Sequence, residues 1–189
     1  MKTNLISLAF VILSLMLAGC VPSIYPFYTS DDIVFEESLL GTWTEEDLST
    51  WTFTTENNKN YVLELTENEP DSPQKKGYFD VHLFKIGDSH FLDLIPGVND
   101  QMNIPFLMKL SMLPMHLLFK VDFVGETVVF RLMNQERCAE MIEKGLISVK
   151  HEKSGDLIVL SAPTDELQRF VIEFGKDAEA YTEEMVLKK

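Results

Sequence analysis

The sequence predicts a mainly β protein that forms a single antiparallel up-and-down barrel, with one or two helices in its C-terminal half. Three observations indicate this fold. Apolar and polar residues alternate along several short segments, as they do in strands with one buried face. Turn-forming residues separate these segments at short intervals, which is typical of barrels and sandwiches. Apolar residues recur at helical spacing in the C-terminal half.

The first half of the chain contains clear alternation. Trp51 and Phe53 alternate with threonines, and a second alternating series follows the turn-forming residues 57–60, which indicates a hairpin. Gly87 and Asp88 mark another turn, which leads into a strand over residues 91–95. The expected inward-facing residues of the earlier strands are Trp51, Phe53, Tyr61, Leu63, Leu65, Phe79, Val81 and Leu83.

The strand pattern is interrupted at residues 102–113. This segment is apolar, rich in methionine and broken by Pro105, so we expect a short helix or a covering loop. Beside a barrel mouth it would act as a lid over an apolar cavity or as a plug, and we favour the plug. Strict alternation resumes from Met115 to Phe123, and residues 128–133 run back.

The two expected helices follow. Asn134 is a suitable N-cap for a helix over residues 135–144, and Gly145 comes directly after it. Thr164 is a suitable N-cap for a second helix over residues 165–174, whose apolar residues share one face. The remaining expected strands cover residues 146–150, 157–161 and 184–188.

The first 19 residues have the pattern of a secretory signal. Lys2 is followed by an apolar run from Leu5 to Leu17 that ends in small residues, and a run of about 7–15 residues is typical of export signals. A membrane-spanning helix needs about 20 apolar residues. Because Pro22 and Pro26 follow directly, the sequence favours a cleaved signal over a spanning helix.

Leu17-Ala18-Gly19-Cys20 closes this run and resembles the lipobox of bacterial lipoproteins. The resemblance implies that a peptidase removes residues 1–19 as a signal peptide, and that Cys20 is lipidated and becomes the N-terminus. The alternative is an ordinary cleaved signal with an incidental cysteine. We expect residues 20–30 to form a lipidated tether and residues 31–189 to form the barrel domain.

The same resemblance predicts where the protein lies. Acyl chains on Cys20 would hold it at the extracytoplasmic side of the cell membrane, because two or more chains anchor a protein stably. The next residue, Val21, is not the aspartate that resembles an inner-membrane retention signal. If the source has two membranes, the outer membrane is therefore favoured.

The chain is strongly acidic. Residues 1–19 contain one basic residue and no acidic one, so the remainder carries 15 basic and 30 acidic residues and a formal charge of −15. This balance argues against nucleic-acid binding and against attachment to anionic lipid through basic side chains. If Cys20 is acylated, Cys138 has no disulfide partner. We expect Cys138 to be a small buried core residue rather than a reactive thiol.

Gly41-Thr42-Trp43 resembles the Gly-x-Trp signature of lipocalins. The resemblance implies an eight-stranded barrel in which Trp43 closes the bottom and packs near an arginine from a late strand. Arg131 lies mid-chain, and Arg169 lies in an expected helix. The wider pattern looks like a group of uncharacterised bacterial lipoproteins, which implies no established activity. That similarity covers residues 25–29, 40–43, 51–53, 91–94 and 164–170.

Five titratable residues on neighbouring expected strands are the candidates for chemistry: Asp80, His82, His90, Asp93 and His116. Histidines and carboxylates bind zinc or act as general acids and bases. However, the sequence contains no HExxH motif, and Asp80 and His82 lie opposite an apolar series, so we expect surface residues. It also contains no Gly-x-Ser-x-Gly elbow and no phosphate-binding glycine loop. We therefore expect no enzyme activity, no cofactor and no bound metal.

Two functions agree with these observations. The first is a binding module for a small apolar or lipid-like ligand, held in the barrel interior by Phe53, Leu63, Leu117 and Phe119. The second is a non-enzymatic scaffold with a filled barrel, whose acidic surface recruits another envelope protein. A cavity of about 300 Å³ or more would indicate the first function. A solid interior beside an exposed apolar patch would indicate the second.

Overall fold

The computed structural model describes residues 20–46, 49–68, 73–97 and 113–189. The expected signal peptide and nearly all of the apolar segment at residues 102–113 lie outside these ranges, so the interpretations of both stay predictions. Within the described residues, no helix has the length and apolarity required to cross a membrane.

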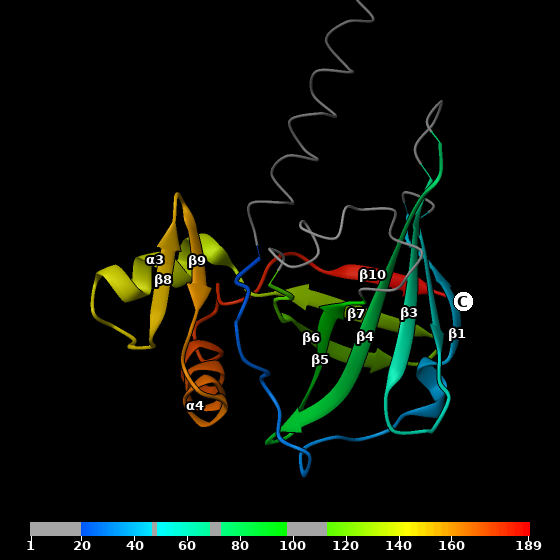
Figure 1. Ribbon diagram of the computed structural model, residues 1–189, viewed down its shortest axis with the longest axis horizontal. Helices are drawn as coiled ribbons and strands as arrows, with labels where there is room; N and C mark the ends of the chain where they lie inside the picture. Colours follow the sequence, from blue (N-terminus) through cyan, green and yellow to red (C-terminus); the bar gives the residue numbers. More distant parts are fainter. Residues whose placement is uncertain (1–19, 47–48, 69–72, 98–112) are drawn as a thin grey trace, which may run out of the picture.

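Eight antiparallel strands close into a barrel in the order β1-β10-β7-β6-β5-β4-β3-β2 (Figure 1). The predicted mainly β fold, with an antiparallel barrel and two helices in the C-terminal half, is therefore confirmed. The barrel strands are β1 (Gly41–Thr44), β2 (Thr50–Thr54), β3 (Tyr61–Glu67), β4 (Lys75–Ile86), β5 (Ser89–Pro96), β6 (Leu117–Val124), β7 (Thr127–Leu132) and β10 (Met185–Lys188).

Alternate side chains of each strand point into the barrel. Val81 opposes Leu94 across the β4–β5 pair, and Leu83 opposes Leu92, so inward residues meet inward residues. All four belong to one buried cluster inside the barrel. The period-two pattern of the sequence therefore does place one face of each strand in a common core.

The two ends of the barrel differ. At the end that we call the turn end, short connections at residues 55–60, 87–88 and 125–126 join β2 to β3, β4 to β5 and β6 to β7. Gly87 and Gly125 both have a φ of 60° there, which glycine adopts without steric cost. At the opposite end, which we call the loop end, β1, β3, β5 and β7 end and β2, β4, β6 and β10 begin.

Residues 33–40 lie across the turn end. Phe35 stacks on Tyr61, the first residue of β3, with ring centres 5.2 Å apart. The short 3-10 helix η1 (Glu37–Leu39) follows, and the indole N–H of Trp43 donates a hydrogen bond of 2.8 Å to its last carbonyl. Buried apolar side chains and a satisfied indole therefore close this end.

Residues 134–182, which we call the C-terminal unit, form a second layer beside the barrel (Figure 1). The unit contains α3 (Gln135–Glu143), the hairpin β8 (His151–Ser154) and β9 (Leu157–Leu160), and α4 (Thr164–Phe174). It packs on outward-facing apolar residues of the barrel, namely Phe84, Phe91 and Leu118. The molecule therefore has two hydrophobic cores, one inside the barrel and one between the barrel and the C-terminal unit.

The caps of the two helices differ from each other. The prediction for Asn134 is confirmed, because its side-chain oxygen accepts a 3.1 Å hydrogen bond from the backbone N–H of Arg137. The prediction for Thr164 is wrong, because Thr164 is already helical and Pro163 occupies the N-cap. The Thr164 hydroxyl instead donates a 2.9 Å hydrogen bond to the carbonyl of Pro26.

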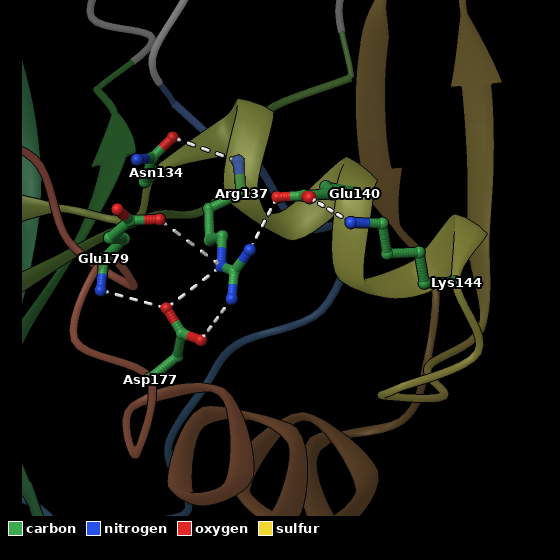
Figure 2. Close-up of polar contacts among 6 residues, drawn as sticks. All are labelled: Asn134, Arg137, Glu140, Lys144, Asp177 and Glu179. Carbon is green, nitrogen blue, oxygen red and sulfur yellow. Dashed lines mark hydrogen bonds and ion pairs between the residues drawn. The ribbon is translucent and has the colours of Figure 1, made fainter.

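Arg137 joins α3 to the segment that follows α4 (Figure 2). Its guanidinium forms a bidentate pair with Asp177, at 2.6 Å and 3.0 Å, and a further bond of 2.6 Å to Glu140. Glu140 also pairs with Lys144 one helical turn later. This network fixes the orientation of α3 relative to residues 177–179.

Residues 21–29, which we call the strap, run between the barrel and the C-terminal unit (Figure 1). The sequence predicts a tether here, but Val21, Ser23 and Phe27 are buried. The backbone of Ser23 exchanges two hydrogen bonds with His116, at 2.8 Å and 2.9 Å. Gln168 of α4 donates to the carbonyl of Phe27 at 3.1 Å. These contacts hold the strap within the fold, because its apolar side chains complete the second core.

Candidate functional site

The four residues predicted to bind a ligand all belong to the barrel core. Phe53, Leu63 and Phe119 are buried, and Leu117 is partly buried against the same cluster. The structure thus confirms that these side chains share one interior. Their role in ligand binding stays a prediction.

Aromatic rings fill the middle of this interior. The ring centre of Trp51 lies 6.0 Å from that of Phe119 and 5.5 Å from that of Phe130. Phe53 is 6.4 Å from both Phe130 and Tyr61. Such tilted and edge-to-face contacts are the favourable arrangements for aromatic pairs. The central layer of the barrel is therefore a packed aromatic core.

The loop end is less covered than this central layer. Its inward-facing apolar side chains come from the ends of strands β3, β7, β6 and β10 and from the first half of β4. These side chains are only partly buried, whereas Leu94 of β5, which opposes Leu117, is buried. They are Leu65, Phe79, Leu117, Leu132 and Met185.

One polar atom of the aromatic core has no partner. The indole N–H of Trp51 is buried, and it makes no hydrogen bond within the part of the chain that the structure describes. By contrast, the indole of Trp43 is satisfied by Leu39. The alternating pattern predicts that Trp51 faces inward, but a strand pattern carries no information on whether an inward indole finds an acceptor.

The environment of Trp43 differs from the expectation drawn from the lipocalin resemblance. In the part of the chain that the structure describes, the ammonium of Lys189 and not an arginine lies over its ring, 4.8 Å from the ring centre. Arg131 instead pairs with Asp122 and Glu184, and Arg169 pairs with Asp165 at 3.1 Å. Gly41 has a φ of 108°, a conformation that favours glycine at the start of β1.

A polar cluster lies beneath the strap. It consists of His82 of β4, Asp93 of β5, His116 just before β6 and Tyr28 of the strap itself. Nδ1 of His82 lies 3.0 Å from the hydroxyl of Tyr28, and the two rings stack. Nδ1 of His116 lies 2.7 Å from one oxygen of Asp93, whose other oxygen accepts the backbone N–H of Phe27 at 3.1 Å. Asp93 is fully buried, contrary to the predicted surface position, because the strap covers this part of the barrel.

Burial changes the acid–base properties of this cluster. It lowers the pKa of His82, while the carboxylates of Asp93 and Asp80 act in the opposite direction. It raises the pKa of Tyr28 to about 12, with a further increase from the same carboxylates. Tyr28 therefore stays protonated and His82 stays neutral at neutral pH, and the tautomer of His82 decides which of the two donates the hydrogen bond.

The polar groups of this cluster make hydrogen bonds within the protein. Both oxygens of Asp93 are engaged, and one ring nitrogen of each histidine is occupied. Across the described ranges, no group of three histidine, cysteine or acidic residues is arranged to hold a metal ion. His90 is separate from the cluster; its ring packs edge-on against Phe123, 5.6 Å away.

The two cysteines have different positions. Cys20 begins the described chain, three residues before the strap pairs with His116 at the start of β6. Since β6 starts at the loop end, Cys20 lies within about 15 Å of that end. Cys138 is fully buried, as predicted, and burial raises the pKa of its thiol to about 12.

Comparisons of the chain with protein-family models, curated proteins and solved structures find no match. The lipobox and lipocalin resemblances therefore rest on short sequence motifs alone. Of the lipocalin resemblance, the structure confirms the closed eight-stranded barrel.

Proposed function

We propose that this chain is a lipid-anchored protein of the cell envelope whose barrel binds a small apolar or lipid-like ligand bearing one hydrogen-bond acceptor. The observation that carries the proposal is the buried indole N–H of Trp51, which has no partner within the described residues. A buried donor without an acceptor costs about 1–3 kcal/mol. A ligand that supplies the acceptor recovers this cost.

The surroundings of Trp51 suit the rest of such a ligand. Phe119 and Phe130 flank the indole and offer apolar contact without competing acceptors. The side chains at the loop end are apolar and only partly buried, so a ligand that enters there would meet apolar surface. Because the central layer is already packed, the ligand is expected to be small or to insert only one chain.

The anchor supports entry from the membrane side. Cys20 lies near the loop end, whereas residues 33–40 close the turn end. Acyl chains on Cys20 would therefore hold the loop end toward the bilayer, from which an apolar ligand would pass into the barrel.

The packing of the aromatic core favours a second candidate, a filled barrel that serves as a scaffold for another envelope protein. Phe53, Tyr61 and Phe130 are at most 1% exposed, as in a solid interior. In this case Trp51 would retain its unsatisfied donor or bind a water molecule, and the interior would take no ligand.

Native mass spectrometry of protein purified from its own membrane, combined with lipid extraction, separates the two candidates. The binding module predicts a co-purifying lipid-like molecule at a ratio near one to one. Trp51→Phe should reduce this occupancy about tenfold, because it removes the donor and keeps a ring. Trp43→Phe is the matched control, since that indole is already satisfied.

Repeated purification without any such molecule, with a protein partner retained instead, would contradict ligand carriage and support the scaffold. Equal occupancy in the two variants would show that Trp51 does not contact the ligand.

The anchor is tested separately. Cys20→Ser should abolish metabolic labelling with a radioactive fatty acid and should leave the signal peptide uncleaved at that position. Cys138→Ser is the control and should be labelled like the unaltered protein, because its thiol is buried. Unchanged labelling of Cys20→Ser would disprove the assignment.

A further inference from the structure

A hollow of about 270 Å³ lies between the outer face of the barrel and α4, away from the barrel interior. Its apolar walls come from Ile86 and Phe91 of the barrel and from Val171 and Ile172 of α4. Ile172 is half exposed, so the hollow opens to solvent on the helix side. The hollow belongs to neither the aromatic core nor the polar cluster beneath the strap.

Lys120 supplies a positive charge to this hollow. It lies on the outward face of β6, between Phe91 and Arg131 on the neighbouring strands. Its ammonium lies 5.2 Å from the ring centre of Tyr181, and within the described residues it has no ion pair or hydrogen bond. By contrast, Lys176 at the rim of the hollow is paired with Glu173. An unpaired ammonium on a chain of net charge −14 is available to an anion.

Tyr181 supplies a second donor. Burial raises its pKa to about 12, so the phenol keeps its proton at neutral pH. Among the described residues its hydroxyl has no hydrogen-bond partner. Gly175 faces this hydroxyl, and a Cβ at position 175 would approach it to 3.3 Å. The glycine therefore leaves room beside the hydroxyl.

We propose that this hollow binds a small monocarboxylate with a compact apolar body, whose carboxylate accepts hydrogen bonds from Lys120 and Tyr181. A carboxylate takes charge-assisted bonds from both donors, and the apolar body rests mainly on Ile86 and Ile172, because Phe91 and Val171 are almost fully buried. A strongly hydrated dianion would gain nothing from these apolar walls. The volume limits the ligand to an aryl acid or a short acyl chain.

The proposal is tested with the full-length chain in lipid nanodiscs, with empty nanodiscs as the blank. Ligand-observed fluorine NMR measures saturable binding of fluorophenylpropanoate, and its alcohol and amine counterparts measure the contribution of the charge. The carboxylate should bind at least about tenfold more tightly than the alcohol, and the amine should not bind. Competition by octanoate would indicate a lipid-derived acid, and its failure to compete would indicate an aryl acid.

Variants assign the binding to the two donors. Lys120→Met should weaken carboxylate binding about tenfold or more, and Tyr181→Phe should weaken it roughly threefold while the alcohol is little affected. Lys150→Met is the matched control, since Lys150 is exposed and does not line the hollow. If Lys120→Met fails to fold, the comparison of acid and alcohol on the unaltered chain still decides the question.

Absence of saturable binding, equal affinity for acid and alcohol, or full binding by Lys120→Met would each overturn the proposal. Trp51→Phe separates this site from the ligand proposed for the barrel. It should leave fluorophenylpropanoate binding unchanged, because Trp51 lies inside the barrel and the hollow lies outside it. Either site can therefore fail without the other.

Discussion

The ammonium of Lys189, which directly follows β10, lies 4.8 Å from the ring centre of Trp43 on the first strand of the barrel. The same ammonium donates a 3.1 Å hydrogen bond to the carbonyl of Ser38 in η1. These contacts lie where the barrel closes with the least pairing, because β1 and β10 share a single register pair, Thr44 with Lys188. Lys189 therefore reinforces the seam between the first and last strands.

Removing this cation should weaken the seam. Lys189→Met is expected to lower the free energy of unfolding by about 0.5–1 kcal/mol, the usual contribution of an exposed cation–π contact. Urea unfolding followed by tryptophan emission measures the effect. Lys188→Met is the matched control and should change the midpoint less, since no ring contact involves that ammonium among the described residues. If both variants lowered the free energy of unfolding equally, the loss of a positive charge alone would explain the effect.

Alternation in the sequence predicted the inward faces of β2, β3, β4 and β6. Tyr61, Leu63 and Leu83 are fully buried where the pattern places them. The resemblance led to an arginine near Trp43, whereas the structure has Lys189 there. Local sequence pattern cannot assign Lys189 to a ring 146 positions earlier, because the contact depends on barrel closure.

The second core was not predicted, although the sequence contains an indication of it. Phe84, Phe91 and Leu118 are apolar on the outward face of strands whose inward face is also apolar. Strands that are apolar on both faces are covered on both sides. What the pattern does not reveal is the cover itself, which comes from the strap and the C-terminal unit through contacts between distant parts of the chain.

The Arg137 network should be energetically coupled. Arg137→Met and Asp177→Asn are each expected to lower the urea midpoint, because each removes the bidentate pair that joins α3 to residues 177–179. The double variant should lose less than the sum of the two, since both remove the same interaction. A double-variant cycle in urea measures this coupling. Lys153→Met, which breaks a more exposed pair with Glu143, should have little effect. Strictly additive losses would show that the pair contributes no coupling.

Cys138 should be chemically inert in the folded protein. At pH 8 a thiol with a pKa of about 12 ionises roughly a thousandfold less than an unperturbed one, and the side chain is also fully buried. In the Cys20→Ser variant, alkylation by iodoacetamide is therefore expected to be slow in buffer and rapid in urea. Mass spectrometry of timed samples measures both rates. Comparable rates in the two conditions would contradict the buried position.

Stability should fall as the pH drops from 7.5 to 5.5. His82 has a folded-state pKa below its ordinary value of 6.5, with burial as the main cause, so below pH 6.5 the unfolded chain takes up a proton that the folded protein does not. This contribution to stability is present above pH 6.5 and is lost as the pH falls through the lower folded pKa. His90 adds to the same trend, because burial and the charge of Lys85 lower its pKa too.

His82→Gln should flatten this pH dependence in part, because glutamine does not titrate and can still accept a hydrogen bond from Tyr28. Urea unfolding at pH 7.5, 6.5 and 5.5 measures the slope in both proteins. Tyr28→Phe serves as the companion variant: it removes the hydroxyl but leaves His82 buried, so most of the slope should remain. Parallel pH profiles for His82→Gln and the unaltered chain would mean that His82 titrates alike in the folded and unfolded states.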